Sequence, residues 1–363
     1  MSERLQRLRT RLGEMGLDAL LVSTPENRRW LSGFTGSAGW LLITSTEALL
    51  ATDFRYVEQA GQQAPAFRVV RITGSYEWLP KLLQETGVRR VGFEAGHVTV
   101  ATYQALVQAL KDAQAREVSL QATQGVVEAL RMKKDPGELA LIAQAVRICD
   151  LALQEVAPTI REGETERAVA WRLEKAMREL GAEGLAFETI VASGPNSALP
   201  HHRPSDRPIQ AGEPIVIDFG ARYQGYCADI TRTFCLGPAP ETFRRVYDIV
   251  LTAQLTALAT IQEGMKAGDA DRIARKVIED AGYTENFGHS LGHGIGLAVH
   301  EAPRLGPGSE TPLEEGTVFT VEPGIYISGW GGVRIEDTVV LEKGRVRSLT
   351  SLPKREDPLG LGS

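Results

Sequence analysis

The sequence predicts two domains, an α/β domain followed by an α+β domain. The chain has 363 residues, more than one ordinary hydrophobic core accommodates. Over roughly the first 120 residues, strand patterns alternate with helix patterns, which is typical of an α/β unit. Past Gly125 long helices and paired strands replace that alternation. We therefore expect the two domains to span residues 1–125 and 126–355.

The composition is that of a soluble globular protein, with 43% hydrophobic and 24% charged residues. A net charge of -6 and a pI near 5.7 argue against nucleic acid or an anionic membrane as a partner. The chain opens with a charged helix pattern, and it lacks an apolar run of about 18 residues, so we expect no signal peptide and no membrane span. Cys149, Cys227 and Cys235 lack Cys-x-x-Cys spacing, which predicts reduced thiols and a cytoplasmic location.

The first domain begins with apolar residues at helical spacing, which predict a helix over 2–15 and a strand over 19–23. A stretch rich in glycine and serine after Asn27 predicts a loop, followed by a hairpin over 40–51 and a helix starting near Asp53. His97 is the one histidine of this domain, and we expect it to be structural or at the surface. The remaining elements predicted are strands over 67–72, 88–93 and 117–122 and helices over 77–86 and 100–111.

The second domain opens with helix patterns over 126–134 and 138–155. Pro136 suits a first helical turn, and Asp135 suits the residue that caps it. A helix over 165–180 precedes a strand over 187–192. After a central hairpin come helices over 240–263 and 269–281, then a strand-rich section over 318–341. Residues 356–363 are expected to form a loose tail.

The central hairpin is the stretch IVIDFGARYQGYCADITRT, which starts at Ile215. Asp218 and Asp229 are symmetric about the Tyr223-Gln224 junction, so a turn centred there places them directly opposite, with Cβ atoms roughly 4.5 to 5.5 Å apart. Two buried carboxylates at that distance require a proton, an arginine or a metal ion between them. Two aspartates near a turn are, taken alone, more often solvated loop residues.

Histidines gather in one part of the chain. Five of the 6 lie between residues 201 and 300: His201, His202, His289, His293 and His300. The segment FGHSLGHGIGLAVHEAPR is too rich in glycine for a helix, so it predicts a loop or strand, and the helical His-Glu pattern of zincins is absent. Any one of these histidines would more often be structural, but their clustering favours a functional site. The glycines around His293 lack the frame of a dinucleotide-binding motif.

A second strand pair, VFTVEPGIYISGWGGVRIEDTVVL, repeats the arrangement of the hairpin. Glu322 and Glu336 are symmetric about Gly329, so they also face each other if Pro323 does not shift the register. Each glutamate lies in an apolar strand pattern, where a charge is costly unless it is paired or bound to metal. Arg334 can neutralise one carboxylate but not four.

The four carboxylates and one imidazole form a plausible set of metal ligands. Together with His293 they suit two divalent ions roughly 3.5 to 4 Å apart that share carboxylates and a water. The excess of oxygen ligands favours Mn²⁺ over Co²⁺ or Zn²⁺. This set predicts the hydrolysis of an amide or ester by hydroxide held between the ions.

The motifs together resemble the pita-bread metallopeptidases, in particular the Xaa-Pro branch that contains prolidases and aminopeptidase P. ALPHHRPSD, IVIDFG with ADITRTF, GHSLGHGIGLAVHE, TVEPGIYI and GGVRIEDTV follow one another in the family's order. FTGSAG and TDFRY resemble the creatinase-type amino-terminal domain. The resemblance covers nearly the whole chain. It implies a curved antiparallel sheet backed by helices in the second domain, a homodimer, and short peptides with proline second as substrates.

The resemblance also assigns roles to residues. It implies that five side chains bind the metal ions: Asp218, Asp229, His293, Glu322 and Glu336. Of these, Asp229 and Glu336 would bridge the two ions. It implies that His201, His289 and His300 handle protons or bind the scissile carbonyl, and that Glu322 also shuttles a proton. His201 is preferred to His202 because it stands 17 residues before Asp218. Arg304, Arg334 and Tyr326 are assigned to substrate binding or to support of the ligands.

The substrate preference is less clearly indicated. Arg304 resembles an arginine that holds the carboxylate of a dipeptide in some prolidases, whereas FTGSAG and TDFRY look closer to aminopeptidase P. We favour the aminopeptidase slightly. Methionine aminopeptidases normally lack the first domain, and creatine amidinohydrolases lack the metal ligands. A non-catalytic peptide-binding protein of this fold is a remote alternative, because such proteins lose ligands that are all present here.

Overall fold

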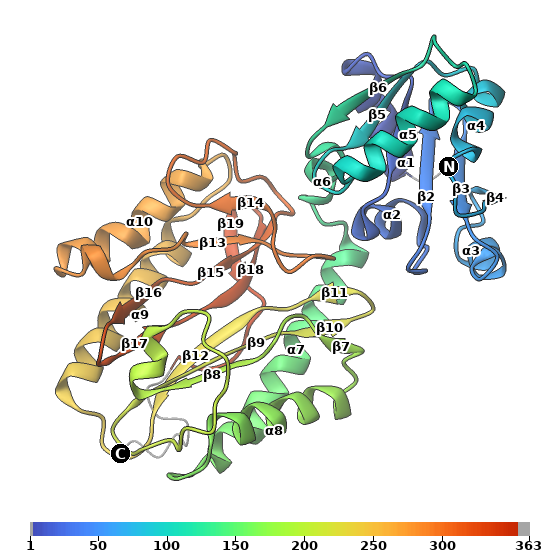
Figure 1. Ribbon diagram of the computed structural model, residues 1–363. Coiled ribbons are helices and arrows are strands. Elements are labelled where there is room, and N and C mark those ends of the chain that lie inside the picture. The colour runs from blue at the N-terminus through green and yellow to red at the C-terminus, as the bar shows by residue number, and fades with distance from the viewer. Residues whose placement is uncertain (1–2, 355–363) are drawn as a thin grey trace. The chain divides into compact units, whose positions relative to one another are not determined.

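The computed structural model describes residues 3–354, and Figure 1 shows the order of its elements. The chain divides into two compact units, Met1–Arg131 and Met132–Ser363. This division assigns helix α6 Val126–Arg131 to the first unit, whereas the sequence prediction placed these residues in the second domain. The tail expected over 356–363 lies outside the described residues.

The first unit is built on one six-stranded sheet with the order β4-β3-β2-β1-β5-β6. β1 pairs antiparallel with β2 and parallel with β5, and β5 pairs parallel with β6, as expected for an α/β unit. Its strands are β1 Ala19–Val22, β2 Trp40–Thr44, β3 Ala48–Thr52, β4 Arg68–Arg71, β5 Arg90–Glu94 and β6 Ser119–Thr123. Its helices are α1 Glu3–Glu14, α2 Pro25–Ser32, α3 Val57–Gln63, α4 Trp78–Thr86, α5 Val100–Asp112 and α6 Val126–Arg131.

Helix α2 corrects one expectation. The chain after Asn27 was expected to be a loop, yet it continues helix α2, which spans Pro25–Ser32 and is capped by Gly33. Proline suits a first helical turn, and Gly33 ends the helix with φ 80°, a conformation that glycine adopts without strain. Trp30 and Leu31 are buried on this helix. The glycine-rich composition therefore describes only the residues from Gly33 onward.

The second unit has long helices and mostly antiparallel strands. Asp135 accepts from the Glu138 backbone and Glu138 bonds back to Asp135, so the predicted helix start is a full capping box. The helices are α7 Pro136–Val156, η1 Ala157–Thr159, α8 Glu166–Glu179, η2 Gly194–Ala198, α9 Glu241–Thr260, α10 Ala267–Asp280 and η3 Thr284–Asn286. The strands are β7 Gly184–Leu185, β8 Ile190–Ser193, β9 Pro214–Phe219, β10 Ala221–Tyr223, β11 Tyr226–Cys227, β12 Ile230–Cys235, β13 Gly292–Gly294, β14 Glu301–Leu305, β15 Val318–Val321, β16 Gly324–Ile327, β17 Gly331–Arg334, β18 Asp337–Glu342 and β19 Arg345–Ser348.

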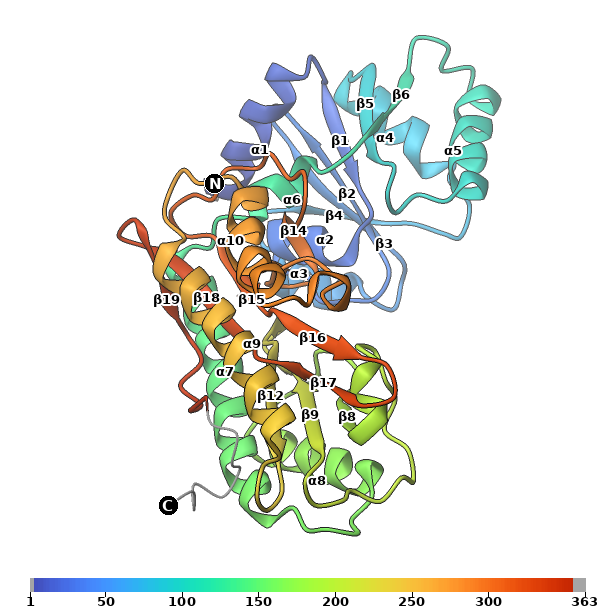
Figure 2. The same ribbon diagram turned by 90° about the vertical axis from the view of Figure 1, so that its left-hand side faces the viewer.

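The strands of the second unit form several short sheets in contact. Their orders are β12-β9-β8, β14-β13-β15-β18-β19, β16-β17 and β11-β10-β7. Figure 2 shows β16 and β17 near β9 and β12, and β17 contacts both of these strands. Helices α7 and α8 contact β10, β11 and β8, while α9 and α10 contact β17, β19 and β14. The helices therefore back the strands from which the site residues project.

The register of the central hairpin differs from the expected one. Asp218 in β9 pairs with Thr231 in β12, not with Asp229. The reason is that the turn is centred on Gln224 and Gly225, which both have positive φ, as a two-residue turn of type I′ requires. The pairing is therefore displaced by two residues. Because side chains alternate with a period of two, this displacement leaves both aspartates on the predicted common face.

The second strand pair has the register predicted from symmetry about Gly329. Gly324 pairs with Arg334, and beyond the break Val321 pairs with Asp337. Glu322 and Glu336 therefore occupy opposed positions between two ladders. Pro323 interrupts the ladder there, since proline has no N–H to donate. The break leaves both glutamates outside the regular strands, next to the cavity described below.

Two further expectations concern the described residues only. No helix among them combines the length and the apolar character needed to cross a membrane. Cys149, Cys227 and Cys235 are buried and form no disulfide bond, in agreement with the expectation of reduced thiols.

Candidate metal centre and active site

One cavity of the second unit collects almost all the predicted site residues. It has a volume of about 910 Å³ and is lined by His201, Asp218, Asp229, His289, His293, His300, Arg304, Glu322, Arg334 and Glu336. Tyr326 is the one predicted residue outside this lining, and its hydroxyl contacts His289. A hollow of about 990 Å³ between α4 and α5 of the first unit holds none of them. The chemistry predicted from the sequence therefore belongs to the second unit.

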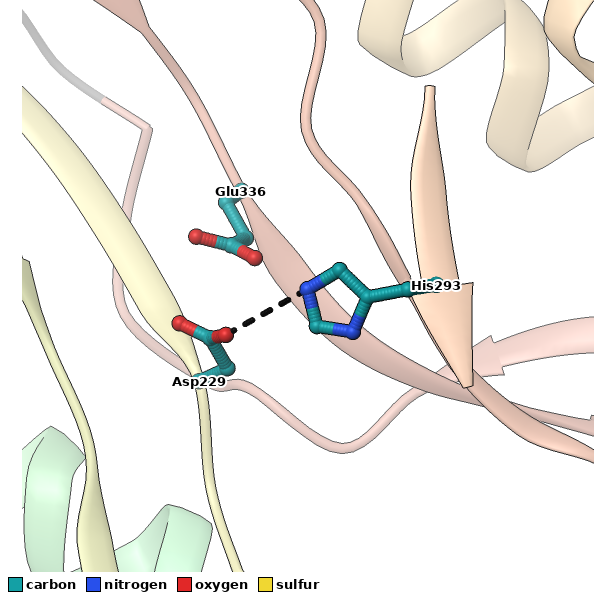
Figure 3. Close-up of side chains that lie close together, drawn as sticks. All are labelled: Asp229, His293 and Glu336. Atoms are coloured by element: carbon teal, nitrogen blue, oxygen red, sulfur yellow. Dashed lines mark ion pairs between the residues drawn. The ribbon is translucent and has the colours of Figure 1, made fainter. Parts of the chain in front are cut away.

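Three side chains from separate elements converge in this cavity. Asp229 precedes β12, His293 lies in β13, and Glu336 lies between β17 and β18. Each offers a ligand atom, and these atoms all lie within 4.8 Å of one another. Figure 3 shows the two carboxylates and the imidazole pointing toward one another, with Nε2 of His293 3.6 Å from Oδ2 of Asp229. Such a convergence of one nitrogen and several oxygens suits a divalent metal ion.

The backbone around His293 fixes its ring. Nδ1 lies 3.1 Å from the carbonyl oxygen of Gly294, so a proton on Nδ1 leaves Nε2 free as a ligand atom. A side chain at Gly292 would collide with the Thr320 backbone, and one at Gly294 would collide with the Ala302 backbone. The Gly-His-Gly motif therefore allows neighbouring strands to approach closely on both sides of the histidine.

The carboxylates are only partly satisfied by the protein. Arg334 Nη2 donates to Asp218 Oδ2 at 2.5 Å, and Thr231 Oγ1 donates to Glu336 Oε2 at 2.6 Å. Oδ1 of Asp218 and Oε1 of Glu336 are buried without a hydrogen-bond partner. Buried oxygens without partners are rare and costly. Because both face a group of carboxylates, a cation is the partner that fits them, and the residues present fit a divalent metal.

Electrostatics support the same conclusion. Burial, followed by repulsion from Glu336 and Asp218, raises the pKa of Asp229 well above its ordinary value. Burial and repulsion from Glu322 do the same to the pKa of Glu336. Burial opposes ionisation of Glu322 as well, but the imidazole of His293, whose Nε2 lies 3.3 Å from Glu322 Oε1, lowers the pKa of Glu322 to about 2. If all of these carboxylates were ionised, the site would therefore carry more negative charge than its own cations balance.

Tyr326 links the metal-side residues to His289. Arg334 Nη1 donates to the Tyr326 hydroxyl at 2.8 Å, and that hydroxyl lies 2.9 Å from His289 Nε2. His289 Nδ1 lies 2.8 Å from the carbonyl oxygen of Ser290, so both of its ring nitrogens have protein partners. Burial lowers the pKa of His289 and raises the pKa of Tyr326 to about 12. Both groups are therefore neutral near pH 7.

The other histidines differ in their surroundings. The ring centroid of His300 lies 4.2 Å from that of His293, and burial together with that neighbour lowers the pKa of His300. His202 Nε2 lies 2.8 Å from the buried carboxylate of Glu166, so His202 is held by a structural contact. His201 and His202 both line the cavity, so the choice of His201 as the functional residue stays a prediction.

Two threonines of the site were not predicted. Thr231 contacts Glu336 and Arg334, and Thr320 contacts Glu322 and the backbone of His293. A signal existed in the sequence. Thr231 stands two residues after Asp229, and Thr320 two before Glu322, so strand periodicity already placed each threonine on the face of a predicted ligand.

Known proteins resemble the whole chain. Family models match residues 4–133, as "Creatinase/Prolidase N-terminal domain", and residues 140–343, as "Metallopeptidase family M24". The uncharacterized peptidase YqhT of Bacillus subtilis is 40% identical over 352 residues, covering 97% of this chain and 98% of that protein. The solved structure of an Xaa-Pro dipeptidase from Bacillus anthracis is 41% identical with a TM-score of 0.94, over 98% of this chain and 99% of that one. The solved structure of an X-Pro aminopeptidase from Thermotoga maritima is 41% identical with a TM-score of 0.88, and the match covers 97% of this chain and 99% of that one.

Proposed function

Because the chain belongs to metallopeptidase family M24 and carries a creatinase/prolidase amino-terminal domain, we propose that it hydrolyses the bond between an N-terminal residue and a following proline. The observation that carries the proposal is the convergence of Asp229, His293 and Glu336 on one point of a peptide-sized cavity. Short peptides with proline second are the proposed substrates. The enzyme is thus a metal-dependent peptidase whose specificity is set by the rest of this cavity.

The proposed cofactor is a pair of divalent ions, with Mn²⁺ favoured over Co²⁺ or Zn²⁺ because carboxylate oxygens dominate the donors. Their proposed ligands are Asp218, Asp229, His293, Glu322 and Glu336. The two partnerless oxygens, Asp218 Oδ1 and Glu336 Oε1, support this assignment. When bound, the ions supply Lewis-acid activation of water and of the peptide carbonyl.

The chain's own groups have distinct proposed tasks. Glu322 carries a proton from water to the leaving proline nitrogen, and its hydrogen bond with Thr320 fixes the carboxylate for that transfer. His201 and His300 line the cavity and bind the carbonyl oxygen as its charge develops. His289 acts through Tyr326 and Arg334, because its ring nitrogens are bonded to protein groups.

We propose that the protein is an aminopeptidase, which accepts peptides longer than two residues. The alternative is a dipeptidase, and Arg304 supports it, since an exposed guanidinium on the cavity wall can pair with the free carboxylate of Xaa-Pro. Similar proteins carry both names. A non-catalytic peptide-binding protein remains the remote alternative.

Three wider features are also proposed. The enzyme is a homodimer, and its location is the cytoplasm, in keeping with three buried cysteines that form no disulfide bond. Residues 1–125 form the creatinase-like amino-terminal domain, and residues 126–355 form the catalytic domain. Nucleic acid and membrane are not proposed as partners, in view of the net charge of -6.

A panel of peptides tests the proposal. The protein is stripped with a chelator and reloaded with Mn²⁺, Co²⁺ or Zn²⁺, and release of the N-terminal residue is measured for Xaa-Pro, Xaa-Pro-Xaa and Xaa-Ala-Xaa. We expect no turnover after chelation, restoration by Mn²⁺, and cleavage of both proline-second peptides but not of the alanine control. Cleavage confined to Xaa-Pro would establish the dipeptidase alternative. Failure of every metal-loaded form on every proline-second peptide would refute the proposed function.

A further inference from the structure

A buried ion pair lies next to the cavity and takes no part in the proposed metal site. Lys134 Nζ contacts Glu301 Oε1 at 2.6 Å, and the two side chains are only 1% and 5% exposed. Lys134 lies just before α7, whereas Glu301 begins β14 and directly follows His300. The pair therefore joins the start of the catalytic unit to the residue after a proposed catalytic histidine.

The loop that carries His300 passes close over this pair. A side chain added at Gly296 would place its Cβ 2.6 Å from Glu301 Oε1 and 2.9 Å from Lys134 Cε. The backbone N–H of Ala298 points to the other carboxylate oxygen of Glu301, at 3.5 Å. The loop of residues 295–300 thus approaches the ion pair at Gly296 and Ala298, and His300 lies at its end.

The lysine is itself held in place. Its backbone N–H donates to the carbonyl oxygen of Gly316 at 2.9 Å, and its Nζ also reaches the carbonyl oxygen of Met132 at 3.3 Å. The loop has a second anchor, because the backbone N–H of Cys227 donates to the Gly296 carbonyl at 2.8 Å. Lys134 therefore offers a fixed positive charge to a segment that is fixed on its other side by the central hairpin.

Energetics argue that the pair serves geometry more than stability. Desolvation of two charges consumes most of their attraction, so a buried ion pair is rarely more stabilising than an apolar pair of the same volume. A charged pair does, however, admit fewer arrangements than an apolar contact, because each oxygen and each N–H has a direction. An ion pair that contacts the histidine loop is suited to fixing the position of that loop.

We propose that Lys134 and Glu301 are positioning residues that hold the 295–300 loop, and with it His300, at the wall of the active cavity. The catalytic consequence rests on the proposed function, whereas the effect on the loop does not. Removing the pair releases the loop and displaces the His300 imidazole from its place 4.2 Å from the His293 ring. Displacements of about 1 Å in a catalytic group reduce turnover strongly.

Hydrogen exchange tests the structural half without any substrate. The variants are Lys134→Arg, Lys134→Met, and the neutral double variant Lys134→Met with Glu301→Gln, which leaves no unpaired charge and so guards against unfolding. In Lys134→Met and in the double variant we expect amide exchange over 295–301 to rise by about 10-fold, while β9 and β12 keep their protection. Lys134→Arg should stay close to wild type. Unchanged exchange over 295–301 in the folded double variant would overturn the proposal.

Kinetics test the catalytic half in the same proteins. In the double variant we expect kcat on Xaa-Pro-Xaa to fall by about 10-fold or more, with KM and the affinity for Mn²⁺ little changed. In Lys134→Arg, which keeps the positive charge, we expect kcat to stay close to that of the wild type. The matched control is Lys276→Met, which removes an exposed lysine paired with Asp280 and should leave kcat unchanged. A double variant with wild-type kcat would refute the catalytic role. A wild-type enzyme inactive on all proline-second peptides would refute the proposed function instead, and the exchange result would still decide this inference.

Discussion

Arg334 and Asp218 form the closest charged contact of the cavity, with Nη2 of the arginine 2.5 Å from Oδ2 of the aspartate. The same guanidinium reaches the Tyr326 hydroxyl and the Thr231 hydroxyl. This leaves Oδ1 as the one buried oxygen of Asp218 without a protein partner. The arginine therefore orients the carboxylate so that a single oxygen faces the proposed metal, and it connects that carboxylate to His289 through Tyr326.

Replacing Tyr326 with phenylalanine removes the hydroxyl that joins Arg334 to His289. We expect kcat to fall by about 10- to 100-fold, the range typical when a group that orients a metal ligand is lost, while the fold is kept. Steady-state kinetics on Xaa-Pro-Xaa measure this change. Tyr223→Phe is the control, because that tyrosine lies near the tip of the central hairpin and should tolerate the change. Equal activity of the two variants would show that the hydroxyl link has no role.

Replacing Asp229 with asparagine removes a proposed bridging ligand and one of the repelling charges. We expect turnover to fall below about 1% of wild type and Mn²⁺ affinity to drop, measured by kinetics and metal titration. Without metal, the variant should be at least as resistant to urea as the metal-free wild type, because burial and repulsion disfavour the charged carboxylate at this place. Asp206→Asn is the control at an exposed aspartate. Near-normal turnover of Asp229→Asn would contradict its role as a ligand.

Replacing Arg304 with glutamine separates the two proposed peptide preferences. If the guanidinium pairs with the free carboxylate of a dipeptide, KM for Xaa-Pro should rise by about 10-fold, since a charge-assisted hydrogen bond contributes about 1.5 to 3 kcal/mol. KM for Xaa-Pro-Xaa should change little, because its carboxylate lies one residue further away. Measuring both substrates on the same preparation provides the internal control. Equal effects on both peptides would show that Arg304 does not read the dipeptide carboxylate.

The buried carboxylate of Glu166 predicts an acid sensitivity of the second unit. Burial opposes its ionisation, but hydrogen bonds from Ser205, Ser193, His202 and Asn196 outweigh burial and lower its pKa to about 2. Because this folded-state pKa lies below the ordinary value of 4.5, the stabilisation is complete above about pH 4.5 and is lost as the pH falls toward 2. The loss corresponds to about 3 kcal/mol.

Urea unfolding at pH 7 and pH 3 checks this expectation. Glu166→Gln should lower the free energy of unfolding at pH 7 and should flatten its decrease between pH 4.5 and 3. Glu179→Gln is the control, because Glu179 ends the same helix with its side chain 63% exposed. A variant whose unfolding free energy follows the wild-type pH dependence would refute the assigned role of Glu166.

The extent to which the sequence predicted the site differs between the two strand pairs. For Glu322 and Glu336, symmetry about Gly329 gave the observed register, because the ladders on both sides of Pro323 keep it. For Asp218 and Asp229 the same argument placed the turn one residue too early, because it ignored that a two-residue turn needs residues that tolerate positive φ. The aspartates still share a face, since the displacement is an even number of residues.

The sequence by itself determined the kinds of side chain, their strand periodicity and the two-domain pattern, because these depend on the order of residues and on local backbone preferences. It also determined the family, whose motifs are contiguous stretches. Only the tertiary structure decided that Asp229, His293 and Glu336 meet within 4.8 Å, that both ring nitrogens of His289 are engaged, and that Lys134 pairs with Glu301. These contacts join elements far apart in the chain, and their distances follow from how strands and helices pack, which no local pattern specifies.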